Sequence, residues 1–281
     1  MIRLLPITCL IIHALFACML SGEIRTPAII GNNMVLQQNH KNPIWGWGNP
    51  GELIQVQIVE QNHKVEVSPE GYWKVFLDPM PASATPKVMT IQGSSELKFE
   101  NILVGEVWLC SGQSNMGWAL GNSDDADLEI MTANYPNLRL VSVPQVGTQE
   151  AQTDFDGQWE STTPEVARNF SAVGYLFGRR LHLALGIPVG LIDNAWGGSA
   201  CEAWIPRDRL NQLPVAKPYM DQWRETEKTF DYDKLLASYK EKLEVWKKKA
   251  EVARKDGKPQ PGSRPRTPRN QLTGQHRPAN L

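Results

Sequence analysis

One serine is better placed to do chemistry than any other polar residue of this chain. An almost uninterrupted apolar run from Ile102 to Cys110 leads into the polar turn Ser111-Gly112-Gln113-Ser114-Asn115-Met116. Such a run predicts a strand buried on both faces of a parallel sheet, and these sheets place their chemistry at the carboxyl ends of the strands. A hydroxyl there becomes a nucleophile if a base removes its proton and N–H groups hold the oxyanion. Ser114 is therefore a candidate nucleophile, and an ordinary turn is the alternative.

A second segment also has an apolar strand that leads into a turn. The strand expected from Ile187 to Ile192 continues through Asp193-Asn194-Ala195-Trp196 into the pair Gly197-Gly198. Paired glycines let the backbone turn its N–H groups toward a ligand. A tight connection between a strand and a helix would use the same residues, so the pattern alone leaves both interpretations open.

Together the two turns resemble motifs of the sialate O-acetylesterase family of SGNH hydrolases. The motif Gly112-Gln113-Ser114-Asn115-Met116 is similar to the one that carries the nucleophile in that family. The resemblance implies that Ser114 is the nucleophile and that its own N–H is an oxyanion donor. It assigns the second oxyanion N–H to Gly198, with Gly197 as the near alternative.

The same motifs suggest residues on the substrate side of the site. Gln113 and Asn115 flank the serine, while Glu202 and Trp204 match the Glu-x-Trp that follows the family's glycine turn. The resemblance implies no cofactor, and the sequence shows no spacing typical of metal ligands. An acidic cluster near residue 125 is interpreted as a solvated loop.

The remaining catalytic groups do not appear as motifs. The family resemblance implies a Gln-Gly-Glu turn and a late Asp-x-x-His, and neither occurs in the 281 residues. Five histidines are present, at His13, His40, His63, His182 and His276, and none follows an aspartate in a strand-end loop. Since triad partners meet in space, this does not exclude them. We expect the catalytic His and Asp to be absent and the chain to be the N-terminal part of a longer enzyme, truncated at its C-terminus.

Three regions follow from the pattern of elements. Residues 1–22 read as an export signal, with a positive start, an apolar run and small residues for cleavage. Residues 23–100 contain alternating runs separated by Pro and Gly, which predict an antiparallel β-sandwich module. From 101 to 281, strands alternate with helices, which predicts an α/β domain. The resemblance makes it an incomplete SGNH-type three-layer α/β/α domain with a parallel sheet.

Two helices stand out within that domain. Apolar spacing predicts a helix from Ala172 to Leu185, ended by Gly186, and a long amphipathic helix over residues 233–256. The proline-rich segment from Gly257 to Pro278 predicts an extended loop. The resemblance places this loop near the sugar site, but we expect it to be poorly ordered.

Cysteine usage agrees with export. Cys18 lies in a segment that faintly resembles a lipoprotein cleavage box, so the chain is expected to be secreted or periplasmic, or anchored by a lipid at Cys18. Cys9 and Cys18 fall in the signal region. Cys110 and Cys201 flank the candidate site, and either a disulfide or two free thiols is compatible with the compartment.

The net charge of the chain reduces the number of partner classes to consider. A net charge of -1 gives no electrostatic reason to expect a nucleic acid or an anionic membrane as partner. The resemblance implies a carbohydrate O-acetylesterase that acts on sialic acid or a related sugar, with an acetylated carbohydrate as partner. A noncatalytic glycan-binding or structural remnant, and an esterase for acetylated xylan or lipid esters, are the alternatives.

Overall fold

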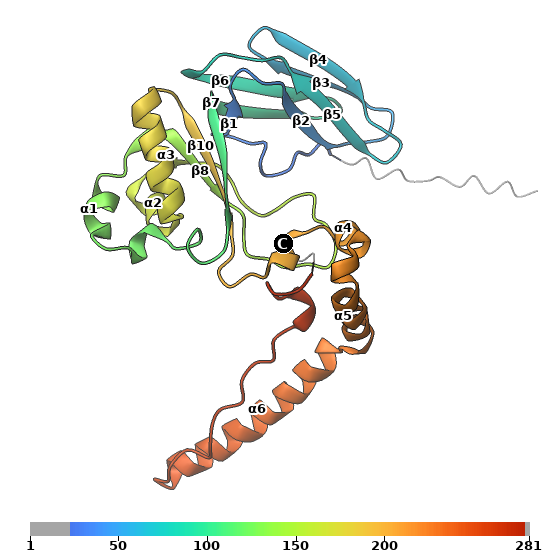
Figure 1. Ribbon diagram of the computed structural model, residues 1–281, viewed down its shortest axis with the longest axis vertical. Coiled ribbons are helices and arrows are strands. Elements are labelled where there is room, and N and C mark those ends of the chain that lie inside the picture. The colour runs from blue at the N-terminus through green and yellow to red at the C-terminus, as the bar shows by residue number, and fades with distance from the viewer. Residues whose placement is uncertain (1–22, 279–281) are drawn as a thin grey trace, which may run out of the picture.

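The computed structural model describes residues 23–278 as a mixed α/β fold with one large sheet and a projecting helical arm (Figure 1). The strands are β1 (Val35–Gln37), β2 (Asn42–Trp47), β3 (Leu53–Ile58), β4 (Gln61–Glu66), β5 (Tyr72–Leu77), β6 (Ser83–Gln92), β7 (Glu96–Gly112), β8 (Tyr135–Ser142), β9 (Glu160–Thr162) and β10 (Val189–Ala195). The helices are α1 (Ala126–Met131), α2 (Pro164–Asn169), α3 (Ala172–Leu185), α4 (Arg207–Gln212), α5 (Lys217–Thr229) and α6 (Tyr232–Lys255). The expected α/β fold class is thus confirmed.

The two halves of strand β7 pair with different strands. Its first half pairs antiparallel with β6, and residues Glu106–Gly112 pair in parallel with β10, which in turn pairs in parallel with β8. The sheet therefore runs in the order β4-β3-β6-β7-β10-β8-β9, with β1 on β7. At the crossover, a Cβ on Gly105 would stand 2.0 Å from the Pro188 carbonyl oxygen, so glycine is required there. The boundary expected at residue 100 consequently lies inside a strand.

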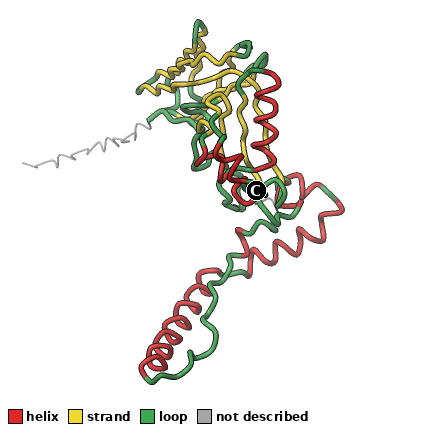
Figure 2. Tube along the Cα trace, turned by 90° about the vertical axis from the view of Figure 1, so that its left-hand side faces the viewer, coloured by secondary structure: helices red, strands yellow, loops and turns green. Residues whose placement is uncertain are grey.

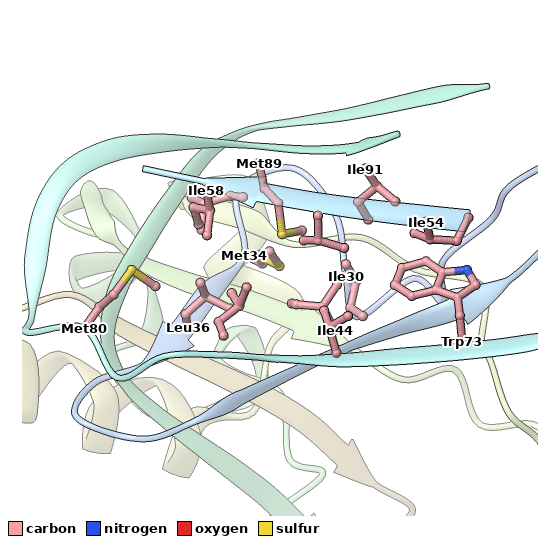
Figure 3. Packing of buried hydrophobic residues seen from close by; sticks show 14 of the residues in the cluster. Ile30, Met34, Leu36, Ile44, Ile54, Ile58, Trp73, Met80, Met89 and Ile91 are labelled. Atoms are coloured by element: carbon pink, nitrogen blue, oxygen red, sulfur yellow. The ribbon is translucent and has the colours of Figure 1, made fainter. Parts of the chain in front are cut away.

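The N-terminal strands enclose a core of their own. The two-stranded sheet β2-β5 and the strands β1, β3 and β6 contribute buried residues to one cluster, which includes Ile44, Ile54, Trp73 and Met89 (Figure 3). Val107, Val141 and Ile192 from the parallel part contact the same cluster. The N-terminal strands therefore pack directly on the region that carries the candidate site.

The opposite face of the parallel strands is covered by α1, α2 and α3. Leu140 and Leu191 point into this helical layer, whereas their neighbours Val141 and Ile192 point to the other face, as the alternation of a strand requires. Helix α3 begins where the Ser171 side chain accepts from the Gly174 N–H and ends at Gly186, whose φ is 68°. The helices α1, α2 and α3 thus hold β8 and β10 in place from one face of the sheet.

Beyond β10 the chain forms a separate helical extension. Helices α4 and α5 share a small core of Leu210, Met220 and Trp223, and α6 projects away from the sheet (Figures 1 and 2). The segment after α6 runs back along it, and the Trp246 indole donates to the Gly262 carbonyl (3.2 Å). The long helix expected over residues 233–256 is confirmed at Tyr232–Lys255.

One expectation needs correction, and one open alternative is decided. The strand before Ser114 is not buried on both faces, because Trp108 and Leu109 are 43% and 63% exposed. The reason is that β7 lies at the edge of the parallel part, where β10 covers only one of its sides. The cysteine alternatives resolve into free thiols, with Cys110 buried and Cys201 exposed.

The N-terminal expectations lie outside the described residues. This applies to the export signal at 1–22, to His13 and to Cys18. Within residues 23–278, no helix has the length and apolar character needed to cross a membrane.

Candidate functional site

The two predicted turns lie side by side at the carboxyl ends of β7 and β10. Strand pairing continues to Ala195 opposite Gly112, and the Trp196 N–H donates to the Gly112 carbonyl (2.9 Å). A Cβ built on Gly197 would stand 3.6 Å from the Ser114 Oγ. The sheet therefore brings together the candidate nucleophile and the glycine pair, which are far apart in the sequence.

The two glycines face different neighbours. Gly197 lies against the Ser114 hydroxyl, whereas the Cβ position of Gly198 faces His276 Cε1 at 3.8 Å and Gln275 Nε2 at 3.9 Å. Gly198 has a φ of 73°, a conformation that glycine adopts without strain. The assignment of the second oxyanion N–H to Gly198 rather than Gly197 stays a prediction.

Ser199 joins the two turns. Gln113 Nε2 donates to its carbonyl (3.4 Å), and the Trp204 indole donates to its hydroxyl (2.8 Å). Ser199 is buried, whereas Gln113 is exposed, so the bond to the Ser199 hydroxyl is the better shielded of the two. Both side chains therefore contact the glycine turn, and their expected place on the substrate side stays a prediction.

Asn115 and Glu202 occupy different surroundings. Asn115 is exposed at the tip of the nucleophile turn, where it lines a shallow cavity of about 400 Å³ together with Ser114 and Val173. Glu202 is half-buried beside Tyr219. Burial, and to a smaller extent the Glu202 carboxylate, raise the pKa of Tyr219. Asn115 is thus open to a substrate, whereas Glu202 is partly covered and lies close to α5.

The C-terminal loop was expected to be poorly ordered, but its end packs against the site. The Gln275 carbonyl accepts from the Ala200 N–H (3.1 Å), and the His276 carbonyl accepts from the Tyr219 hydroxyl (3.3 Å). The Arg277 guanidinium lies 5.4 Å from the centre of the Trp223 ring. The reason is that α4 and α5 supply the packing partners. The signal in the sequence was the family resemblance, which had placed this loop near the sugar site.

The described histidines lie in different parts of the structure. His40 is exposed, His63 lies near Asp78 on the antiparallel part, and His182 Nδ1 bonds the Ile187 carbonyl (2.7 Å). Only His276 among residues 23–278 lies beside the glycine turn. Within the same residues no hydrogen bond connects the Ser114 hydroxyl to a histidine, and no group of His, Cys, Asp and Glu could hold a metal ion.

Asp193 is a titratable group that sequence reasoning did not single out. It lies at the end of β10, opposite Cys110, and one carboxyl oxygen is buried without a hydrogen-bond partner. Burial raises the pKa of Asp193 to about 6, and backbone N–H groups of Ser171 and Ala195 offset this in part. Burial and the nearby Asp193 carboxylate raise the pKa of the Cys110 thiol to about 11. The pKa of Asp193 therefore lies well above that of an ordinary aspartate.

The nucleophile turn is also fastened to α3. The Ser171 hydroxyl donates to the Met116 sulfur (3.5 Å), and the Ala172 N–H donates to the Trp118 carbonyl (2.8 Å). These bonds tie the residues after Ser114 to the helix that covers β10. The fold and site together define a protein of the α/β class with its site at the carboxyl ends of adjacent parallel strands.

Comparisons with known proteins identify the family within this class. The chain is 36% identical over 213 residues to the human sialate O-acetylesterase, a match that covers 69% of this chain and 41% of that protein. It is 34% identical over 211 residues to the sialate O-acetylesterase of Mus musculus, covering 68% of this chain and 39% of that protein. The crystal structure of a novel carbohydrate acetylesterase from Xanthomonas citri superposes with a TM-score of 0.64 at 36% identity, covering 69% of this chain and 46% of that one.

No family model matches the chain. The relatives nevertheless agree with one another, since each is named as an acetylesterase. The chain belongs to the sialate O-acetylesterase family. It spans about two fifths of the length of the curated relatives it matches.

Proposed function

We propose that this chain carries the nucleophile of a carbohydrate O-acetylesterase that removes O-acetyl groups from sialic acid or a related sugar. The observation that supports this most strongly is the contact between the Ser114 hydroxyl and Gly197, whose Cβ position lies 3.6 Å from Oγ at the ends of adjacent parallel strands. The names of the relatives support the substrate class.

The chemistry is acyl transfer through serine. The Ser114 oxygen attacks the acetyl carbonyl carbon, a base takes the hydroxyl proton, and the N–H groups of Ser114 and Gly198 hold the oxyanion. The carbon–oxygen bond to the sugar then breaks, and the sugar hydroxyl leaves with the proton. Water hydrolyses the acetyl-serine and releases acetate. The base remains to be assigned, and His276 is the described histidine to test first.

The finer description of the fold belongs to the same proposal. The parallel strands and the α1–α3 layer are the described part of an SGNH-type three-layer domain, and the N-terminal strands are a β-sandwich module that supports it. Export through residues 1–22 completes the proposal. N-terminal sequencing of the mature protein separates cleavage of a free signal from a lipid-modified Cys18.

Acetate release from O-acetylated sialic acid and from acetylated xylan tests the function. We expect the 281-residue chain to turn over little of either sugar, because within residues 23–278 no histidine bonds the Ser114 hydroxyl, and a serine that is not activated by a base keeps only the rate enhancement of binding and the oxyanion hole. Binding of acetylated sugars in preference to the deacetylated forms should persist, and NMR shifts at the nucleophile turn should report it.

Two serine variants make the test specific. Ser114→Ala should abolish any acetate release, whereas Ser111→Ala, at an exposed serine near the end of β7, should not. Release that survives Ser114→Ala would contradict the serine mechanism. Binding of glycans without preference for the acetyl group would favour a noncatalytic glycan-binding remnant, and preference for acetylated xylan over sialic acid would favour the xylan esterase.

A further inference from the structure

A second cavity opens beside the glycine turn and does not contain Ser114. Its volume is about 460 Å³, and it lies between the ends of β8 and β10 and the segment 143–156. Trp196 lines it, and the next residue, Gly197, lies against the Ser114 hydroxyl. A ligand in this cavity would therefore be separated from the nucleophile by the width of one turn.

The cavity has an aromatic wall. Trp196, Trp204 and Phe155 contribute to it. The Trp196 backbone is fixed by its bond to the Gly112 carbonyl, and the Trp204 indole is fixed by its bond to the Ser199 hydroxyl. Aromatic surfaces with a few polar groups are typical of small-molecule sites, and the apolar C–H face of a sugar ring stacks on such surfaces. Because the Trp204 ring is already held, little conformational entropy of that side chain is lost on binding.

The charge of the lining selects among sugars. Glu150, Asp154 and Asp156 line the cavity, and no Lys, Arg or His among residues 23–278 does. Asp154 is oriented by the N–H groups of Ala28 and Phe155, both at 2.8 Å from its Oδ1. Carboxylates accept hydrogen bonds from sugar hydroxyls but repel a second carboxylate. A sialic acid carboxylate is therefore disfavoured here, and a neutral sugar is favoured.

We propose that this cavity is a subsite for a neutral sugar residue that is linked to the acetylated sugar at Ser114. The inference rests on the proposed function and extends it: the substrate is a glycan of two or more residues rather than a free acetylated monosaccharide. The acidic cavity then accepts the neutral neighbouring sugar and disfavours a sugar that carries a carboxylate, so the glycan can bind in only one orientation.

Calorimetric titration and protein NMR with two probes test this on the full chain. Lactose serves as the neutral probe and N-acetylneuraminic acid as the anionic one. We expect lactose to shift the indole signals of Trp196 and Trp204, and N-acetylneuraminic acid to leave them unchanged. Phe155→Ala should weaken lactose binding at least fivefold. Phe177→Ala, which removes a partly exposed ring on α3 away from the cavity, should not.

A charge variant provides a test that does not depend on the packing of Phe155. Glu150→Gln combined with Asp156→Asn changes two exposed side chains. The double variant should keep lactose binding and bring N-acetylneuraminic acid into the cavity. Lactose that leaves the two indoles unchanged, or anion binding equal in wild type and double variant, overturns the subsite.

Failure of the subsite is distinguishable from failure of the proposed function. If acetylated sugars still bind at Ser114 while lactose leaves the cavity lining unchanged, the subsite is refuted and the esterase proposal stands. If lactose occupies the cavity but no acetyl ester binds at Ser114, the esterase proposal is refuted and the cavity remains a site for neutral sugars.

Discussion

Replacing Asp193 by asparagine should change how the stability of the protein depends on pH. The carboxyl group has an ordinary pKa of 3.8, and burial raises it to about 6. Asparagine keeps the shape of the side chain but cannot ionise. The variant therefore removes the free energy needed to ionise a buried group and leaves the packing at the end of β10 in place.

The magnitude follows from the change in proton affinity. The interval from 3.8 to about 6 corresponds to an upper limit of about 3 kcal/mol, because a tenfold change in affinity equals about 1.4 kcal/mol. Asp193 keeps some contact with solvent, so screening reduces the expected effect to about 1–2 kcal/mol. Since the native state holds its proton more tightly than the unfolded state, the wild type loses this stability as pH rises from about 4 to about 6.

Chemical denaturation of wild type and Asp193→Asn at pH 4 and pH 7.5 measures the effect. The free energy of unfolding of the variant, relative to wild type, should rise by about 1–2 kcal/mol between the two pH values. Asp124→Asn, an exposed aspartate in the loop before α1, serves as the control and should give no such difference. A constant difference between Asp193→Asn and wild type at both pH values would refute the argument.

Three further variants test the framework by thermal and chemical unfolding. Gly178→Ala places a methyl group 2.5 Å from Leu191 Cδ1 and should cost about 1–3 kcal/mol; unchanged stability would show that β10 yields easily. Gly198→Ala, at a φ of 73°, should cost about 1 kcal/mol, and an unaffected melting temperature would contradict the left-handed backbone. Arg139→Met removes a buried guanidinium that bonds Asn33 and Asn101 and should cost about 3 kcal/mol; a neutral effect would exclude that network as a stabilising element.

Local patterns in the sequence predicted much of the fold. The helix expected from Ala172 to Leu185 has those bounds, because its serine cap and its terminal glycine are both local signals. The exposure of Leu109 could not be read in the same way, since it depends on which strands lie beside β7. Periodicity describes one element, whereas strand order depends on contacts that are distant in the sequence.

The residues of the candidate site also differ in whether a local pattern could single them out. Ser114 and the glycine pair could be singled out because each follows a recognisable strand, and the structure brings them together. Their catalytic roles stay predictions. Asp193 and His276 could not be assigned in advance, because one depends on burial at a strand end and the other on the packing of a proline-rich loop against α5.

The shared strand β7 has a consequence for the order of events in folding. Its first half pairs with β6, a close neighbour in the sequence, but its second half pairs with β10, where Ala195 follows Gly112 by 83 residues. During synthesis, the N-terminal strands can therefore assemble while the second half of β7 still presents an open edge. Open edges recruit other strands, and contacts between distant residues form slowly. We expect the nucleophile turn to be among the last parts of the described chain to acquire its shape, and the nascent chain to depend most on chaperones at that stage.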